Sequence, residues 1–256
     1  MIEVRDLYKE FDQTPVLKGI NAVFEQGKTS LVIGRSGSGK TVLLKCMLGL
    51  LTPEKGDILY DGTSYTEMND DDQRDLRKNI GMVFQGSALF DSSTVEENVM
   101  FPLKMFTDQS VGEMLERVDF VLKRVNLEGS NDKYPAELSG GMQKRVAIAR
   151  AIVMNPKYLF CDEPNSGLDP KTATVIDNLI QEITKEYNIT TIINSHDMNS
   201  VMEIGEKIIF LKDGVKEWDG HSGLVFKTDN EALTDFVYSS NLFKKVREAQ
   251  LKEDRY

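Results

Sequence analysis

Apolar and polar positions alternate along the first sixty residues, in EVRDLYKEF, VLKGINAVFEQG and GDILYDG. Alternation with a period of two is typical of strands that bury one face. Residues that favour turns separate these stretches. The pattern therefore predicts short antiparallel strands at the beginning of a core.

A different pattern interrupts this alternation in TSLVIGRSGSGKTVLLKCMLGL. A short apolar run comes first, a loop rich in glycine and serine follows, and an apolar helical pattern comes last. We predict a strand, a tight loop and a helix in direct succession.

The middle of the chain is dominated by helical patterns. NDDDQRDLRK places acidic residues before basic ones, as the helix dipole favours, and predicts a solvated helix. IGMVFQ then predicts a buried strand. Across residues 94–127 apolar residues recur at helical spacing, and Ser110 with Glu113 forms a capping box. Together these patterns predict a helical lobe over about residues 86–156.

Strands and helices alternate again after the lobe. KYLFCDE and ITTIIN predict buried strands, with a helix between them that begins at Asp169-Pro170. KIIFLKDGVKEWDG predicts a hairpin that turns at Asp213-Gly214. Alternation of this kind predicts a mostly parallel sheet covered on both faces.

Composition narrows the class of protein. The chain has 256 residues and a formal net charge of −10, so the basic surface of a nucleic-acid partner is not expected. Cys46 and Cys161 each lie in an apolar run, which predicts reduced, buried thiols and a cytoplasmic location. No run of 18 apolar residues and no signal-peptide pattern occurs, so we expect neither a membrane span nor export.

The glycine-rich loop has the pattern of a phosphate-binding loop. GRSGSGKT matches G-x-x-x-x-G-K-[ST] between an expected strand and an expected helix, which is the context that the motif requires. Backbone N–H groups of such a loop surround phosphates, the lysine reaches the β- and γ-phosphates, and the last hydroxyl binds Mg²⁺. We therefore predict ATP and Mg²⁺ as cofactors and an α/β phosphate-loop core. The predicted nucleotide-binding residues are Gly34, Arg35, Ser36, Gly37, Ser38, Gly39, Lys40 and Thr41.

Two carboxylates end the strand YLFCDE, at the edge where α/β sheets place ligands. Asp162 is the candidate ligand for Mg²⁺, and Glu163 is the candidate general base for the attacking water. The alternative is a polar turn that merely ends the strand. The phosphate-binding loop earlier in the chain makes that alternative the weaker one.

The stretch LSGGMQKRVAIARA begins a helix with serine and glycine, which weaken helices, and continues with a good helical pattern. The first turn of a helix carries unpaired N–H groups and the positive end of the dipole, so it can bind an anion. Ser139, Gly140 and Gly141 would suit the γ-phosphate of ATP. The helical lobe is not expected to fold back onto its own phosphate loop, so we predict that a second, head-to-tail copy supplies this segment.

Together, the phosphate loop, LSGG and DEP resemble the ATP-binding subunit of an ABC transporter, over about residues 1–225 and in the family's motif order. The resemblance implies a dimer that holds two ATP molecules between the phosphate loop of one copy and the LSGG of the other. It also implies five further site residues. These are Phe11 and Val16 at the adenine, Gln85 at Mg²⁺ and the water, Asp169 in the SGLD loop that crosses the dimer, and His196 at the γ-phosphate.

Each of these assignments has a simpler alternative. Phe11 would equally suit a core aromatic at strand spacing, and Gln85 could cap a strand. His196 follows the strand ITTIIN, and this position favours the functional interpretation. The resemblance thus implies that Lys40, Gln85, Glu163 and His196 carry the catalysis, and that Thr41, Gln85 and Asp162 hold the metal.

The subfamily is suggested by Met142, which replaces the more common glutamine after LSGG, and by GSALFDSSTVEENVMFPL. Both resemble Mla-type phospholipid-trafficking cassettes. That resemblance implies phospholipid transport between bacterial membranes, an integral permease, an MCE-domain lipid-binding partner, and a place at the inner face of the inner membrane. The alternatives are another importer or exporter cassette, such as an amino-acid importer, or a soluble ABC ATPase acting on DNA or ribosomes. A kinase would leave the Ser-Gly-Gly helix start unexplained.

The last part of the chain, residues 226–256, is expected to be a helical extension or a tail. NEALTDFVYSS predicts a short helix. Leu242, Phe243 and Val246 could continue as an amphipathic segment that contacts the partner cassette, or the segment could be a solvated tail.

Overall fold

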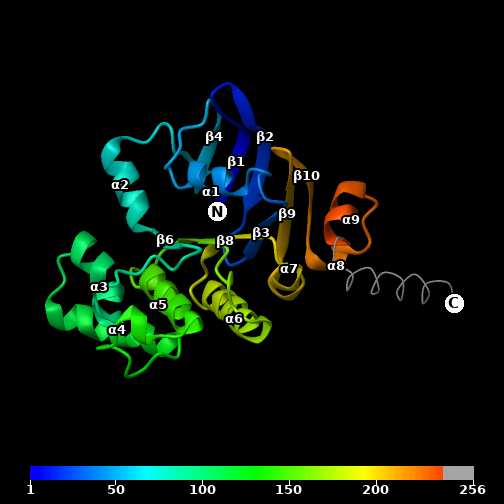
Figure 1. Ribbon diagram of the computed structural model, residues 1–256. Helices are drawn as coiled ribbons and strands as arrows, with labels where there is room; N and C mark the ends of the chain where they lie inside the picture. Colours follow the sequence, from blue (N-terminus) through cyan, green and yellow to red (C-terminus); the bar gives the residue numbers. More distant parts are fainter. Residues whose placement is uncertain (239–256) are drawn as a thin grey trace.

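The computed structural model describes residues 1–238, and an antiparallel sheet covers one side of it (Figure 1). Its strands run in the order β2-β1-β4-β5. Ile2 and Val4 of β1, two residues apart, are fully or almost fully buried, which confirms the predicted alternation. A register shift between Val4 and Leu7 then makes Leu7 the next buried residue. The bounds are β1 (Ile2–Phe11), β2 (Thr14–Phe24), β4 (Lys55–Tyr60) and β5 (Thr63–Ser64).

The central sheet runs in the order β10-β9-β3-β8-β7-β6. Neighbouring strands from β9 to β6 are parallel, and β10 pairs with β9 as an antiparallel hairpin. The predicted mostly parallel sheet and the hairpin at Asp213-Gly214 are therefore confirmed. The bounds are β3 (Thr29–Ile33), β6 (Ile80–Val83), β7 (Tyr158–Asp162), β8 (Thr190–Ser195), β9 (Lys207–Lys212) and β10 (Val215–Gly220).

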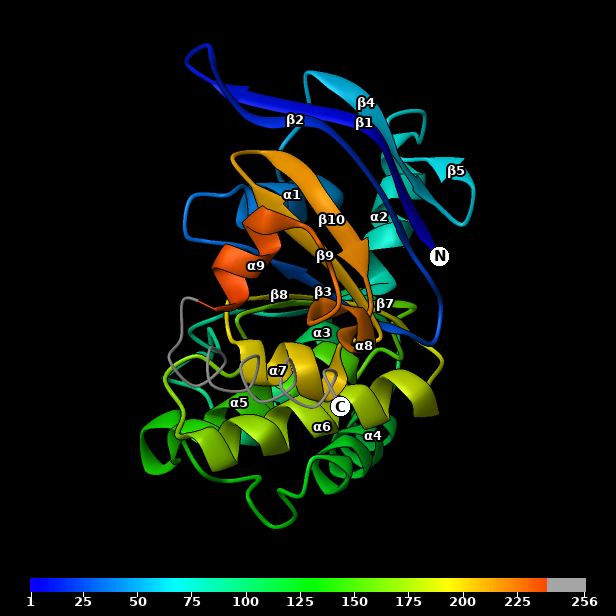
Figure 2. The ribbon, with the colours of Figure 1, turned by 90° about the vertical axis from the view of Figure 1, so that its right-hand side faces the viewer.

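Helices cover both faces of the central sheet. Helix α1 (Lys40–Met47) lies between the two sheets, where Leu43 and Met47 pack with residues of both. Helices α5 (Gly140–Ile152), α6 (Pro170–Glu186) and α7 (Met198–Ile204) lie on the opposite face, as Figure 2 shows for α6 and α7. The layered α/β architecture is thus the predicted one.

The helical lobe is formed by α3 (Val95–Phe106) and α4 (Val111–Arg124), which pack on α5, with the short 3-10 turn η1 (Pro135–Glu137) before α5. Residues 94–127 were expected to be helical, and the structure divides them into two helices. Each helix has its own capping box, at Thr94 with Glu97 and at Ser110 with Glu113. These boxes fix two separate helix starts.

Helix α2 (Asp70–Lys78) buries none of its residues, as its charge pattern predicts. Two short helices, α8 (Ser222–Val225) and α9 (Glu231–Val237), follow β10, and α9 confirms the helix expected in NEALTDFVYSS. Leu242, Phe243 and Val246 lie outside the described residues. The thiols of Cys46 and Cys161 are buried and free, as expected. Within residues 1–238, no helix has both the length and the apolar character needed to cross a membrane.

Candidate functional site

Four neighbouring parallel strands, in the order β3-β8-β7-β6, end at one edge of the central sheet. The phosphate-binding loop follows β3, His196 follows β8, Glu163 follows β7, and Gln85 comes two residues after β6. Motifs that are far apart in the sequence therefore meet because their strands are adjacent. This is the edge where α/β sheets bind ligands.

A cavity of about 900 Å³ lies at this edge. Residues from all four strand ends contribute to its wall, together with Val16 from β2 and Phe236 from α9. The predicted site residues that line it are Val16, Arg35, Ser36, Gly37, Gly39, Lys40, Thr41, Gln85, Glu163 and His196.

The phosphate-binding loop curls around the Lys40 side chain. The Lys40 ammonium donates to the carbonyl oxygens of Gly34 at 2.8 Å and Arg35 at 3.1 Å. Burial lowers the pKa of Lys40, and the nearby charges of Glu163 and Asp162 oppose that shift. The loop thus holds a buried cation beside two acidic groups.

Close contacts, with a backbone carbonyl in one case and a side chain in the other, make two glycines of this loop hard to replace. A Cβ at Gly34 would lie 2.3 Å from the Leu211 carbonyl oxygen. A Cβ at Gly39, where φ is +104°, would lie 2.8 Å from Leu17. Any larger residue would have to push the loop away from the sheet, so the sequence pattern reflects real steric limits.

Glu163 is the centre of a hydrogen-bond network across three strand ends. Its Oε1 lies 2.8 Å from His196 Nδ1, and its Oε2 accepts from Gln85 Nε2 at 2.9 Å. Gln85 Nε2 also lies 3.4 Å from Ser166 Oγ. Glu163 itself has a positive φ of 47°, and its N–H donates to the Asn194 carbonyl oxygen at 3.0 Å. The carboxylate is therefore held in one orientation from both sides.

The donors available for a metal are oxygens. Thr41 offers a hydroxyl, Gln85 an amide oxygen and Asp162 a carboxylate, and Mg²⁺ prefers such ligands. Asn194 Nδ2 donates to Asp162 Oδ1 at 3.1 Å and so orients that carboxylate. Among the described residues no group of three or more His, Cys, Asp or Glu side chains could hold a metal by itself.

Phe11 lies at the tip of the β1-β2 hairpin, with 43% of its surface exposed. Lys9 Nζ lies 5.2 Å from the centre of its ring. Phe11 is therefore not the core aromatic of the simpler interpretation. It is also not among the residues that line the cavity, whereas Val16 is.

The Ser139–Gly141 segment is likewise not part of the cavity wall. Ser139 caps α5 by accepting from the Met142 N–H at 3.3 Å. A Cβ at Gly140 would lie 3.5 Å from Leu168, and one at Gly141 would lie 2.7 Å from Thr172. The segment thus lies beside the SGLD loop, where Asp169 caps α6 by accepting from the Thr172 N–H at 3.1 Å.

Sequence reasoning missed two cations that hold the Gln85 loop. Lys144 is 5% exposed and donates to the Gln85 carbonyl oxygen. Arg150 donates to the carbonyl oxygens of Ser87 and Ala88, each at 2.8 Å. Burial lowers the pKa of Lys144, and the charge of Glu163 opposes that shift. The sequence signal was available: Lys144 has the same helical spacing as the buried residues Ala147, Ile148 and Ala151.

Phe236 was also missed, because it belongs to the segment expected to be an extension. It lines the cavity beside the phosphate-binding loop and is 9% exposed. No sequence motif marks it. Its place follows from the packing of α9 on β9, where the rings of Phe236 and Phe210 lie 5.3 Å apart.

A mostly parallel sheet with a glycine-rich phosphate loop, a buried lysine and paired acidic residues defines a phosphate-loop nucleotide hydrolase. The sequence model described as "ABC transporter" matches residues 17–166, more than half of the chain. The chain belongs to the ABC transporter family, as an ATP-binding cassette. It is therefore an ATPase that uses ATP and Mg²⁺.

Three comparisons illustrate the relationship. The methionine import ATP-binding protein MetN of Clostridium tetani is 42% identical over 216 residues, which cover 84% of this chain and 67% of MetN. The probable ribonucleotide transport ATP-binding protein mkl of Mycobacterium leprae is 39% identical over 198 residues, covering 77% of this chain and 57% of mkl. The solved dimeric cassette MJ0796, bound to ADP and Pi, has a TM-score of 0.78 and 33% identity, covering 87% of this chain and 99% of MJ0796.

The chain thus spans about two thirds of the MetN relative and just over half of mkl. These relatives carry the names of import and solute-transport proteins. They favour the importer alternative over the phospholipid assignment, and they give no support to an MCE-domain partner.

Proposed function

We propose that the chain is the ATP-hydrolysing subunit of a membrane importer and that it acts as a head-to-tail pair. One observation carries this proposal. Lys40, Gln85, Glu163 and His196 line a single cavity, whereas the Ser139–Gly141 segment lies elsewhere on the same chain. A second copy is needed to bring that segment to the nucleotide, and the dimeric state of MJ0796 supports such a pair.

In this proposal the phosphate-binding loop, Gly34 to Thr41, surrounds the phosphates of ATP with backbone N–H groups. Lys40 moves its ammonium from the loop carbonyls to the β- and γ-phosphates. Val16 contacts the adenine, and Phe11 reaches it from the hairpin tip.

Hydrolysis needs a positioned water and a group that takes up its proton. Glu163 serves as the general base, since its carboxylate lies at the strand end beside Lys40 and is fixed by its two hydrogen-bond partners. Gln85 orients the water, and His196 contacts the γ-phosphate. Thr41, Gln85 and Asp162 would hold Mg²⁺, which neutralises charge on the phosphate oxygens when bound. The partner copy adds Ser139, Gly140 and Gly141 on the far side of the γ-phosphate, while Asp169 holds the loop that crosses the dimer.

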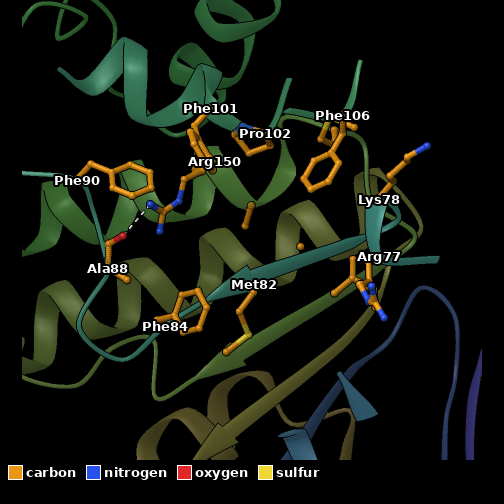
Figure 3. A pocket seen from close by; sticks show the side chains of 14 residues that line it. Arg77, Lys78, Met82, Phe84, Ala88, Phe90, Phe101, Pro102, Phe106 and Arg150 are labelled. Carbon is orange, nitrogen blue, oxygen red and sulfur yellow. Dashed lines mark hydrogen bonds between the residues drawn. The ribbon is translucent and has the colours of Figure 1, made fainter. Parts of the chain in front are cut away.

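We further propose that an integral permease docks in a groove of about 290 Å³ between β6, α2 and α3. Figure 3 shows aromatic side chains gathered around it, with Arg77 and Lys78 at its rim and the hydrogen bond from Arg150 to Ala88. Four phenylalanines of this groove, each between 42% and 44% exposed, are Phe84, Phe90, Phe101 and Phe106. A surface of this kind suits an amphipathic helix with acidic residues on its polar side.

The loop that carries Gln85 links the groove to the catalytic cavity. Phe84 and Ala88, which line the groove, flank Gln85 in the sequence, and Gln85 donates to Glu163. A permease helix that moves in the groove would therefore move Gln85. This is how we propose that transport and hydrolysis are coupled.

For the cargo we propose methionine or a similar amino acid, on the strength of the MetN relatives. The phospholipid hypothesis depends on Met142 and on residues 86–103, and the comparisons do not support it. Attachment to the permease would place the cassette at the inner face of the membrane.

The test is affinity purification of the tagged full-length chain from native membranes, followed by amino-acid uptake into vesicles that contain the recovered complex. Phe101→Asp should lose the permease, because it places a charge in the groove. Phe120→Asp is the matched control, since Phe120 is an aromatic on α4 outside the groove that is at least as exposed as Phe101, at 51% against 42%. Methionine uptake that requires ATP would support the proposal. Recovery of an MCE-domain protein with phospholipid would replace the amino-acid cargo, and recovery of no integral membrane protein would overturn the importer proposal.

A further inference from the structure

A buried polar cluster of three residues lies behind the SGLD loop. Asn165, Asp177 and Ser200 are 8%, 3% and 2% exposed. Asn165 Nδ2 lies 3.2 and 3.3 Å from the two carboxylate oxygens of Asp177 and donates to Ser200 Oγ at 2.7 Å. The Ser200 hydroxyl in turn hydrogen-bonds Asp177. The Asn165 amide group is therefore the donor that joins Asp177 and Ser200.

The cluster joins three separate segments of the chain. Asn165 comes two residues after Glu163, Ser200 comes four residues after His196 in α7, and Asp177 lies in the middle of α6. The segments that carry Glu163 and His196 are thus attached to the same carboxylate. They also carry the pair whose side chains lie 2.8 Å apart at the cavity.

A carboxylate in this position has an energetic cost. Burial raises the pKa of Asp177 to about 6; hydrogen bonds from Ser200 and Asn165 oppose that shift, and the charges of Asp197 and Glu203 add to it. An apolar side chain would avoid the cost of burying a charge. It could not accept hydrogen bonds from both Asn165 and Ser200, so the Glu163 segment and α7 would lose their common anchor.

We propose that Asp177 is a positioning residue for ATP hydrolysis, which holds Asn165 and Ser200 so that Glu163 and His196 stay within hydrogen-bond distance. This inference rests on the proposed function of Glu163 and His196. Asp177 is not among the residues that line the nucleotide cavity, and it acts only through the two segments. Its loss should therefore change the rate of hydrolysis more than the binding of ATP.

Asp177→Ala and Asp177→Asn in the full-length chain separate positioning from folding. Asp177→Ala should lower kcat roughly tenfold and leave the KM for ATP within about twofold. Asp177→Asn keeps an oxygen acceptor for Asn165 and a polar partner for Ser200, so it should restore most of the lost kcat. Ser200→Ala gives a second, milder loss if Asp177→Ala does not fold.

Thr184→Ala is the matched structural control. Thr184 is fully buried on the same helix, about two turns beyond Asp177. It hydrogen-bonds the Ile180 carbonyl oxygen and Thr191 and takes no part in the cluster. It should lower Tm without a comparable loss of kcat. If Thr184→Ala and Asp177→Ala lower kcat equally, or if Asp177→Asn is as slow as Asp177→Ala, the positioning role is wrong.

A double-mutant cycle adds a readout that a purely structural role would not change. In a His196→Ala background, Asp177→Ala should cause little further loss of kcat, because the pair it positions is already broken. Additive losses would overturn the inference. A Glu163→Gln chain that hydrolyses ATP at the wild-type rate would instead overturn the proposed function, so the two failures are distinguishable.

Discussion

Glu163 and His196 face each other across 2.8 Å, from the carboxyl ends of the adjacent strands β7 and β8. A carboxylate oxygen can only accept, so Nδ1 carries the proton and Nε2 is the ring atom left for a further partner. Glu163 also accepts a hydrogen bond from Gln85. Its carboxylate is therefore held by one residue from each of the segments that follow the neighbouring strands β6 and β8. The orientation of the Glu163 carboxylate is therefore fixed by these two hydrogen bonds.

Replacement of Glu163 by glutamine should stop turnover while leaving ATP binding intact. Glu163→Gln keeps the size and most hydrogen bonds of the side chain but removes its ability to take up a proton. We expect kcat to fall at least a hundredfold, in the range typical of a lost general base. Steady-state kinetics measure turnover, and binding of a fluorescent ATP analogue measures affinity. The control is Glu128→Gln, because Glu128 is an exposed carboxylate on the lobe. Substantial turnover by Glu163→Gln would show that the base is another group.

Loss of the Lys144 ammonium should loosen the Gln85 loop. Lys144→Met keeps the apolar stem but removes the hydrogen bond to the Gln85 carbonyl oxygen. Because a buried charged hydrogen bond is worth about 1.5–3 kcal/mol, we expect kcat to fall roughly tenfold or more. ATP affinity should change little, since Lys144 does not line the cavity.

Lys123→Met is the matched control for this prediction, because the Lys123 side chain is 75% exposed on α4. Steady-state ATP hydrolysis over a range of ATP concentrations separates kcat from KM. A rise in KM with an unchanged kcat would mean that Lys144 supports binding and not the position of Gln85.

The sheet and its functional edge could be predicted because local patterns encode both. Period-two alternation marked β1 and β2, and each apolar run that ended in a polar motif became a strand of the central sheet. The phosphate loop, Glu163 and His196 directly follow strands, and Asp162 is the last residue of β7. Once the strands are parallel, their carboxyl ends must meet. Gln85, Glu163 and His196 therefore came together as expected.

Tertiary contacts could not be predicted in the same way. Residues 94–127 form two helices because each of two capping boxes begins a separate helix. The spacing of apolar residues alone indicated one helical region. Phe236 reaches the cavity only because α9 packs against β9. Asp177 has the helical spacing of the buried residues Ala173 and Ile180, but only its contacts with Asn165 and Ser200 explain why a carboxylate is buried there.

A methyl group at Gly141 should impair the helix start that we propose faces the partner's ATP. The added Cβ would lie 2.7 Å from the Thr172 methyl group, and Thr172 is held by Asp169 at the N-terminus of α6. Gly141→Ala therefore displaces Ser139 or the SGLD loop. We expect lower turnover and weaker ATP-dependent dimerisation, with unchanged ATP binding to the single chain.

Gly112→Ala is the control for this substitution, because a Cβ there meets nothing within 4 Å. It should be neutral or slightly stabilising, by up to about 1 kcal/mol, since alanine favours helix. Dimer formation is measured by light scattering in the presence of ATP, with each glycine variant made in a Glu163→Gln background. Equal dimerisation of the two variants would show that the Ser139–Gly141 segment does not lie at the dimer interface.

The raised pKa of Asp177 predicts how its contribution to stability depends on pH. In the folded chain the pKa is about 6, above the ordinary value of 3.8 that applies when the chain unfolds. Between these two values the folded state binds more protons than the unfolded state, so the free energy of unfolding falls as pH rises. The loss of stability caused by ionised Asp177 levels off above pH 6, and a pKa shift of this size corresponds to about 3 kcal/mol.

Urea unfolding of the wild type and Asp177→Asn at several pH values between 5 and 7.5 measures this contribution. Ionisation of Asp177 should lower the free energy of unfolding of the wild type by about 1 kcal/mol between pH 5 and 7. Asparagine does not ionise, so Asp177→Asn should not show this decrease. The difference between the two chains removes the effects of all other carboxylates, which are common to both. A difference that stays constant with pH would mean that Asp177 is ionised throughout this range and that its hydrogen bonds outweigh its burial.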